Sequence, residues 1–242
     1  MADSTTKIVG FPLYNGVTLL DFAGASEVFA FTNGAYTPIW LAPTLSPILT
    51  SEGLSVVPSH TFDKHPPIDI LFVPGGDANG VVDSMGNKIF QDFIKTTTKT
   101  AAWVGSVCVG AFIVAAARVF DGCSITTYWS QLPNLKLLET KMDISVPQGF
   151  PRVVIDFHKK RFSGGGVSSS IDLALKLVEV LNGVEAAQET QLSIQYAPKP
   201  SINAGDPSTA PKSLTAKVIK EQAKAFIEPI RKAVEGLTQA YN

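Results

Sequence analysis

The stretch Trp103-Val-Gly-Ser-Val-Cys108-Val-Gly-Ala111 decides the fold, because it joins two apolar elements through a single cysteine. It lies inside a run without charged residues from Thr100 to Ala117. The run predicts a buried strand over 101–104, a tight turn over 105–110 and a buried helix over 109–119. A cysteine in a turn that leads from a strand directly into a helix has the geometry of a nucleophile elbow.

Strands and helices alternate on both sides of this stretch. The expected strands cover residues 7–13, 36–42, 54–57, 69–73, 101–104, 152–156 and 160–163, and the expected helices cover 19–31, 87–99, 109–119, 168–181 and 185–194. Residues 69–73 are apolar after the first one, as in a strand that is buried on both faces. The alternation predicts an α/β fold in which helices cover both faces of a mostly parallel sheet.

The C-terminal part differs from the rest in composition. Residues 196–211 hold four prolines and read as a linker, and 214–241 then predict a long helix. Its apolar stripe consists of Leu214, Val218, Phe226, Ile230, Val234, Leu237 and Tyr241. Pro229 is expected to kink or interrupt this helix. The stripe packs either on its own domain or on a partner subunit, so we predict a single domain over 1–242 with 196–242 as a C-terminal extension.

Composition excludes several classes of protein. The chain of 242 residues is 45% hydrophobic and 17% charged, with a net charge of −1. These values exclude intrinsic disorder and a strongly basic nucleic-acid surface. The uncharged run of residues 100–117 is short for a membrane span and contains turn-forming glycines, and the first ten residues lack the apolar core of a signal peptide. We therefore predict a cytoplasmic protein that binds neither nucleic acid nor membranes.

The two cysteines are predicted to differ in role. Cys108 lies at a helix N-terminus, where backbone N–H groups and the helix dipole are expected to lower the thiol pKa. The alternative is a small buried residue without chemistry. For Cys123, at the start of an expected strand, that structural interpretation is favoured. Two cysteines indicate a reducing compartment, in which a Cys108–Cys123 disulfide is not expected.

Two further motifs complete the candidate site. Asp21 is an acid within the apolar segment Leu19–Gly24, where it is either a helix N-cap or a buried acid whose pKa is raised. Pro74-Gly75-Gly76 ends a strand and is either a plain turn or a set of backbone N–H donors for a substrate. His60, His65 and His158 neither neighbour Cys108 in sequence nor have zinc-site spacing, so we predict no metal.

Six segments together resemble the ThiJ/PfpI superfamily, and within it the isocyanide hydratases. They are LLDFAGASEVFA from Leu19, DILFVPGG from Asp69, SVCVGAFIVAAA from Ser106, SITTYW from Ser124, FSGGGVSSSIDLAL from Phe162 and YAPKPSINAGDPSTAP from Tyr196. The last segment discriminates, because many members of the superfamily lack it. The resemblance implies a flavodoxin-like three-layer sandwich, a homodimer and no cofactor.

The resemblance also implies roles for single residues. Cys108 matches the catalytic thiolate and Asp21 the acid/base carboxylate. The turn at Gly75 and Gly76, together with Val109, is expected to offer backbone N–H groups to the substrate. This chain has Val109 where the hydratases have a threonine after the cysteine, and Tyr128 where they have a histidine. Neither position therefore supplies an imidazole near Cys108, which argues against a Cys–His hydrolase.

The expected activity is thiol-dependent hydration of an organic isocyanide to an N-substituted formamide, through a thioimidate on Cys108. Two alternatives use the same cysteine. One is a glyoxalase or deglycase that acts on α-oxoaldehydes, and the other is a redox-sensing or chaperone-like dimer in which Cys108 is oxidised rather than turned over.

Overall fold

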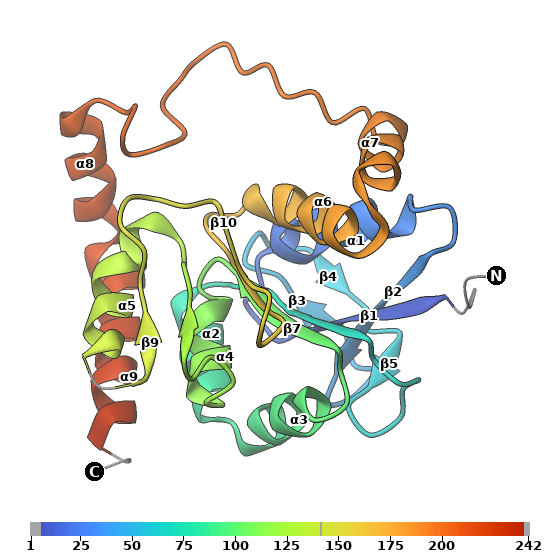
Figure 1. The fold of residues 1–242 in the computed structure, drawn as a ribbon. Coiled ribbons are helices and arrows are strands. Elements are labelled where there is room, and N and C mark those ends of the chain that lie inside the picture. Colours follow the sequence, from blue (N-terminus) through green and yellow to red (C-terminus); the bar gives the residue numbers. More distant parts are fainter. Residues whose placement is uncertain (1–5, 141, 240–242) are drawn as a thin grey trace.

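The computed structural model describes residues 6–140 and 142–239, and a seven-stranded sheet forms its centre (Figure 1). The strand order is β10-β11-β7-β6-β1-β2-β5, and all neighbours are parallel except β10 and β11. The bounds of these strands are β1 Lys7–Pro12, β2 Tyr36–Ala42, β5 His60–Thr61, β6 Ile70–Val73, β7 Trp103–Val107, β10 Val153–Asp156 and β11 Arg161–Gly164. Two small two-stranded sheets pair β3 (Ile48–Leu49) with β4 (Ser55–Val56) and β8 (Cys123–Ser124) with β9 (Ile144–Ser145).

Helices cover both faces of the large sheet, which confirms the predicted three-layer sandwich (Figure 1). Helices α1 (Leu19–Ala30) and α6 (Ser169–Asn182) pack against each other on one face, with α7 (Val184–Ser193) beside α6. Helices α2 (Ala78–Gly86), α3 (Lys88–Thr98) and α4 (Gly110–Ala116) lie on the other face. The residues of β6 and β7 are all buried, as their apolar sequences require.

The order of the strands places a crevice above the middle of the sheet. From β1 the chain proceeds to β2 on one side, and later to β6 and β7 on the other side. The connections that leave β1 and β6 therefore lie on opposite faces, and such a switch point is where open α/β sheets bind ligands. Asp21 follows β1, Gly75 follows β6 and Cys108 follows β7, so the topology gathers all three predicted site residues at this edge.

The structure corrects the sequence prediction around the elbow. Strand β7 extends to Val107, so Gly105 is not in a turn but is paired with Phe162 of β11. A Cβ atom on Gly105 would lie 2.0 Å from the Phe162 carbonyl oxygen, which shows why glycine is tolerated, and needed, inside this strand. The turn is confined to Cys108 and Val109, and α4 ends at Ala116, before the predicted end.

Sequence patterns missed α2 and α5 (Leu132–Glu139). Helix α2 begins after Asp77, whose side chain accepts a hydrogen bond of 2.8 Å from the Gly80 N–H, but its glycine-containing sequence resembles a loop. Helix α5 contains Pro133 in its first turn, where proline is tolerated. The predicted hairpin around His158 is confirmed by β10 and β11.

The C-terminal extension packs on its own domain. It consists of α8 (Lys212–Gln222), a π-helical turn over Ala223–Ile227 and α9 (Glu228–Gln239). The π turn ends just before Pro229 in α9, so the predicted interruption by this proline is confirmed. Ile230 and Val234 are fully buried, and α9 contacts α2 and α5. Tyr241, the last residue of the predicted stripe, lies outside the described residues.

The described helices contain no segment that is both long and apolar enough to cross a membrane.

Candidate active site

Cys108 occupies a strained elbow between β7 and α4. Its φ of +56° lies in the left-handed region, which costs a residue with a side chain about 1–3 kcal/mol. Its N–H donates to the carbonyl oxygens of Gly164 and Gly165, at 3.1 and 2.8 Å, and its carbonyl oxygen accepts from Thr127 Oγ1 at 2.8 Å. These backbone contacts hold Cys108 in the unfavourable conformation, which confirms the geometry of a nucleophile elbow.

Asp21 lies in the first turn of α1 and is fully buried. The N-cap of this helix is Thr18, so the interpretation of Asp21 as a helix cap is wrong. Instead, Asp21 Oδ2 accepts a hydrogen bond of 2.8 Å from the Gly75 N–H, and the other oxygen, Oδ1, is buried without a hydrogen-bond partner among the described residues. An unpartnered buried polar atom is uncommon and calls for a functional explanation.

Gly75 brings the carboxyl group and the cysteine together. A Cβ atom on Gly75 would lie 2.8 Å from Asp21 Oδ2, 2.8 Å from the Val109 nitrogen and 2.9 Å from Cys108 Cβ. Only a residue without a side chain leaves room for these three groups to converge. At the neighbouring position, a Cβ atom on Gly76 would lie 2.4 Å from a backbone oxygen of the loop after β1.

Burial determines the charge state of the pair. Burial raises the pKa of Asp21 to about 8, although hydrogen bonds from Gly75 and Cys108 oppose the change. Burial also raises the pKa of Cys108, and the negative charge of Asp21 raises it further, while the Val109 N–H opposes the change. The prediction that the Cys108 pKa is lowered is therefore wrong. The side chain is only 4% exposed, and the loss of hydration raises the thiol pKa more than the helix N-terminus lowers it.

The two groups together hold protons at neutral pH. A carboxylate and a thiolate this close repel each other, so their titrations are coupled. Because the pKa of Asp21 is about 8, the carboxyl group is mainly neutral at pH 7 and faces a thiol. The arrangement therefore offers a nucleophilic sulfur next to an acid that is able to give one proton and take another.

The predicted N–H donors have different positions. The Gly75 N–H is engaged by Asp21, and the Val109 N–H is directed at the Cys108 sulfur. Gly76 pairs with Val17 in an isolated bridge that ties the end of β6 to the segment before α1. The structure thus places all three residues at the site, and their contact with a substrate stays a prediction.

Two site residues were not found from the sequence. Tyr14 is buried, its hydroxyl donates to the Pro74 carbonyl oxygen at 3.1 Å, and burial together with Asp21 and Cys108 raises its pKa. Thr127 holds the Cys108 carbonyl as described above, and lies in one of the segments that carried the family resemblance. Neither residue type has a spacing that predicts such contacts.

The remaining cysteine and the histidines lie elsewhere. Cys123 is in β8, and both cysteines are free. His60 is in β5, and His158 is in the turn of the hairpin. His65 follows β5, and its ring makes a T-shaped contact with Phe93. Within residues 6–140 and 142–239, no group of three His, Cys, Asp or Glu side chains is placed to hold a metal ion.

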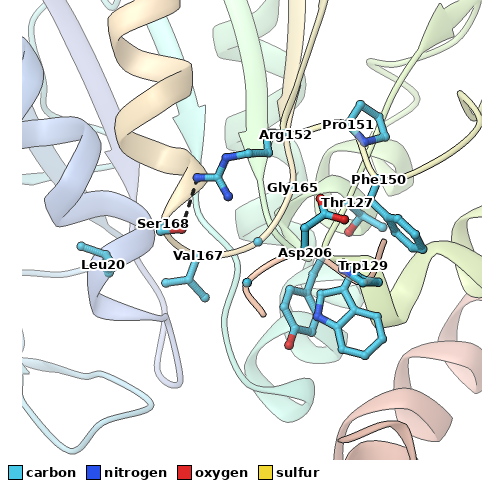
Figure 2. A pocket seen from close by; sticks show the side chains of 14 residues that line it. Leu20, Thr127, Trp129, Phe150, Pro151, Arg152, Gly165, Val167, Ser168 and Asp206 are labelled. Atoms are coloured by element: carbon cyan, nitrogen blue, oxygen red, sulfur yellow. Dashed lines mark hydrogen bonds between the residues drawn. The ribbon is translucent and has the colours of Figure 1, made fainter. Parts of the chain in front are cut away.

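A cavity of about 310 Å³, whose lining residues are drawn in Figure 2, lies close to the pair. Its lining includes Leu20, which precedes Asp21, and Thr127 and Gly165, which bind the backbone of Cys108. Cys108 and Asp21 themselves are not part of the lining. The lining therefore includes residues that adjoin the pair in sequence or through backbone hydrogen bonds.

Comparison with known proteins identifies the class. The DJ-1/PfpI family matches residues 7–180. The isonitrile hydratase of Pseudomonas putida is 35% identical over 222 residues, which cover 90% of this chain and 91% of the relative. The transcriptional regulator GbdR of Pseudomonas aeruginosa is 25% identical over 187 residues, which cover 73% of this chain and 47% of the regulator. A ThiJ/PfpI family protein from Pseudomonas syringae has a crystal structure with a TM-score of 0.86 and 27% identity, covering 95% of this chain and 91% of that one.

The fold and the cysteine elbow thus define an α/β protein with a thiol site. The chain belongs to the DJ-1/PfpI family, as the resemblance predicted. It is similar to a hydratase over nearly its whole length and to regulators over part of theirs.

Proposed function

We propose that this protein is a cofactor-free hydratase that converts organic isocyanides to N-substituted formamides. The observation that carries the proposal is the buried Cys108–Asp21 pair, in which a carboxyl group with a pKa of about 8 faces the nucleophile. The similarity to an isonitrile hydratase over 90% of the chain supports the choice of substrate.

The first step adds the thiol to the terminal carbon of the isocyanide. The Cys108 sulfur attacks that carbon while Asp21 delivers its proton to the same carbon, and the carboxylate that forms takes the proton of the thiol. One S–C bond and one C–H bond form, one S–H bond breaks, and Asp21 is neutral again. The product is a thioimidate, in which the former isocyanide carbon is bonded to the sulfur and doubly bonded to nitrogen.

The second step adds water. Asp21 protonates the imine nitrogen and then, as a carboxylate, removes a proton from the water that attacks the carbon. The adduct collapses when its C–S bond breaks and the hydroxyl proton returns through Asp21 to the sulfur. The formamide leaves, and the thiol and the acid are restored, so isocyanide plus water balances the product.

The geometry argues against a Cys–His enzyme and against the redox sensor, whereas the oxoaldehyde alternative, which would use Cys108 and a carboxylic acid as well, is distinguished by its product. The chain has three histidines, and His60, His65 and His158 lie in β5, in the segment after it and in the hairpin turn, so Cys108 is paired with a carboxyl group rather than an imidazole. The Cys108 side chain is 4% exposed and its pKa is raised, whereas redox-sensing cysteines are accessible and carry a low pKa.

A comparison of substrates tests the proposal. Purified protein is expected to form N-cyclohexylformamide from cyclohexyl isocyanide, measured by chromatography, and to form little lactate from methylglyoxal. Lactate formation at a higher kcat/KM than formamide formation would contradict the proposal and favour the oxoaldehyde activity. A peroxide-dependent function of Cys108 without any turnover would favour the sensor.

The homodimer and the cytoplasmic location stay predictions. Light scattering at micromolar concentration is expected to give the mass of two chains. A monomer under those conditions would contradict the dimer and leave the chemistry of the site unaffected.

A further inference from the structure

The cavity beside the reactive pair has aromatic walls. Tyr128, Trp129 and Phe150 are among its lining residues. Figure 2 shows the apolar side chains of Leu20 and Val167 on the side opposite Trp129 and Phe150. Its volume of about 310 Å³ is at the lower end of the range of small-molecule sites. Aromatic walls at this size suit a compact apolar ring.

The charged groups of the cavity do not form an anion site. The guanidinium group of Arg152 is paired with Asp172 and also binds Ser168 Oγ at 3.2 Å. Asp206 adds a carboxylate, and hydrogen bonds from Ser208 lower its pKa, so it stays charged. Because the one cation among these groups is already neutralised, the cavity favours an uncharged group.

The C-terminal extension holds the aromatic wall in place. Tyr128 Oη accepts a hydrogen bond of 3.2 Å from the side-chain amide of Gln222, the last residue of α8. The Tyr128 ring also packs edge-on against Phe226 of the π turn, with 5.9 Å between ring centroids. The neighbouring Trp129 ring lies 5.8 Å from Tyr128. The wall is therefore fixed from behind before any ligand arrives.

A second cavity lies behind this wall. It has a volume of about 200 Å³ and extends to Leu214 and Val218 of α8. Both cavities are lined by Tyr128, Trp129, Gly205 and Pro207. Tyr128, Trp129, Gly205 and Pro207 thus lie at the boundary between the two spaces.

We propose that the cavity of about 310 Å³ binds the N-substituent of the substrate, an uncharged cycloalkyl or single aryl ring, and that Trp129 limits its length. The assignment rests on the proposed function, because it takes the reacting carbon to lie at Cys108. A ring seated between Trp129 and Phe150 extends from the reactive pair toward the partition. A substituent of two linked rings meets the indole, whereas removing the indole joins the two cavities.

A change of specificity tests this assignment. Trp129→Ala is expected to lower kcat/KM for cyclohexyl isocyanide about tenfold, mainly through KM, and to raise it for 4-biphenylyl isocyanide. Trp129→Phe, which disturbs packing less, is expected to shift both values in the same directions by a smaller factor. Phe157→Ala is the control, because Phe157 is an exposed aromatic side chain in the hairpin that lines neither cavity, and both values are expected to stay unchanged.

Binding separates this proposal from the proposed function. Calorimetry is expected to show a matching change in affinity. Trp129→Ala should bind N-cyclohexylformamide more weakly than the wild type does, and N-(4-biphenylyl)formamide more tightly. If the affinities for the two formamides change in this way but no isocyanide is turned over, the hydratase activity is refuted and the assignment of the cavity is supported. If the wild type turns over isocyanides but Trp129→Ala lowers kcat/KM equally for both substrates, or changes neither value, the cavity assignment is overturned.

Discussion

Cys108 and Cys123 are both free and buried, and the pKa of each is raised, yet only one of them lies in a reactive arrangement. Cys108 has a φ of +56° and faces a neutral acid, Asp21. Cys123 lies in the short strand β8, with Asp156, Lys159 and Arg161 as its charged neighbours, and its sulfur donates weakly to the Asp121 carbonyl at 3.9 Å.

The comparison shows that burial does not distinguish the proposed catalytic thiol from the other cysteine. What differs is the partner: a buried group able to exchange protons near Cys108, and a mixed set of partly exposed charges near Cys123. The two positions also differ in backbone strain. The positive φ of Cys108 is unfavourable, and hydrogen bonds to the end of β11 and to Thr127 hold it in place.

Exchanging each sulfur for oxygen is expected to give the largest contrast. Cys108→Ser replaces the thiol by a much weaker nucleophile and should lower kcat for isocyanide hydration by about 10³-fold or more. Cys123→Ser should change kcat by less than about twofold, because Cys123 is remote from the reacting atoms. Steady-state formamide formation measures both. Equal losses in the two variants would remove the distinction between the cysteines.

Replacing the acid next to each cysteine by its amide is expected to give the second largest effect. Asp21→Asn keeps the size of the side chain but is unable to release a proton, and it should lower kcat about 100-fold. Asp156→Asn, beside Cys123, is the matched control and should leave kcat unchanged. Turnover by Asp21→Asn at the wild-type rate would contradict the two-residue mechanism.

Adding one methyl group at the convergence point should have a moderate effect. Gly75→Ala places a carbon 2.8 Å from both Asp21 Oδ2 and the Val109 nitrogen, so it should lower activity and destabilise the protein by about 1–3 kcal/mol. Gly86→Ala adds the same group at a helix position with nothing within 4 Å, and should not destabilise the protein. Denaturant unfolding and the hydration assay check both. A Gly75→Ala protein with wild-type stability and activity would mean that the site tolerates wider spacing.

The raised pKa of Asp21 predicts a specific dependence of stability on pH. The folded pKa of about 8 exceeds the unfolded value of 3.8, so the folded protein keeps a proton that the unfolded chain releases. The resulting stabilisation is complete below about pH 4 and is lost as the pH rises through about 8.

Relative to Asp21→Asn, the wild type should therefore lose about 1.4 kcal/mol in free energy of unfolding for each pH unit between 5 and 7. Urea unfolding of both proteins at several pH values gives this difference. The same slope for both would place the pKa of Asp21 near its ordinary value, and would remove the neutral acid from the mechanism.

Titration of the reactive thiol is expected to give the smallest effect. In a Cys123→Ser background, thiolate absorbance near 240 nm should give a Cys108 pKa above the free value of about 8.5, because burial and Asp21 both raise it. Asp21→Asn removes one of these causes and should bring the pKa down. A pKa below the free value in the starting protein would restore the prediction made from the helix N-terminus alone.

The sequence by itself determined the order and type of the main elements and the place of the elbow. Strands 7–12, 36–42 and 70–73 and most helices were predictable because apolar periodicity is a local property. The small residues around Cys108 indicate a sharp turn for the same reason. Helices α2 and α5 were not predicted. The glycines of α2 favour a loop unless the helix is capped, and Pro133 of α5 favours a loop unless it lies in the first turn of a helix.

Only the tertiary structure decided the chemistry of the site. The convergence of Asp21, Gly75 and Cys108 depends on the order of β1, β6 and β7 in the sheet, which no local pattern contains. The direction of both pKa changes depends on how much water the fold excludes, and here burial outweighs the helix terminus. The aromatic cavity likewise exists only where the C-terminal extension folds back against Tyr128, because its walls come from segments far apart in the chain.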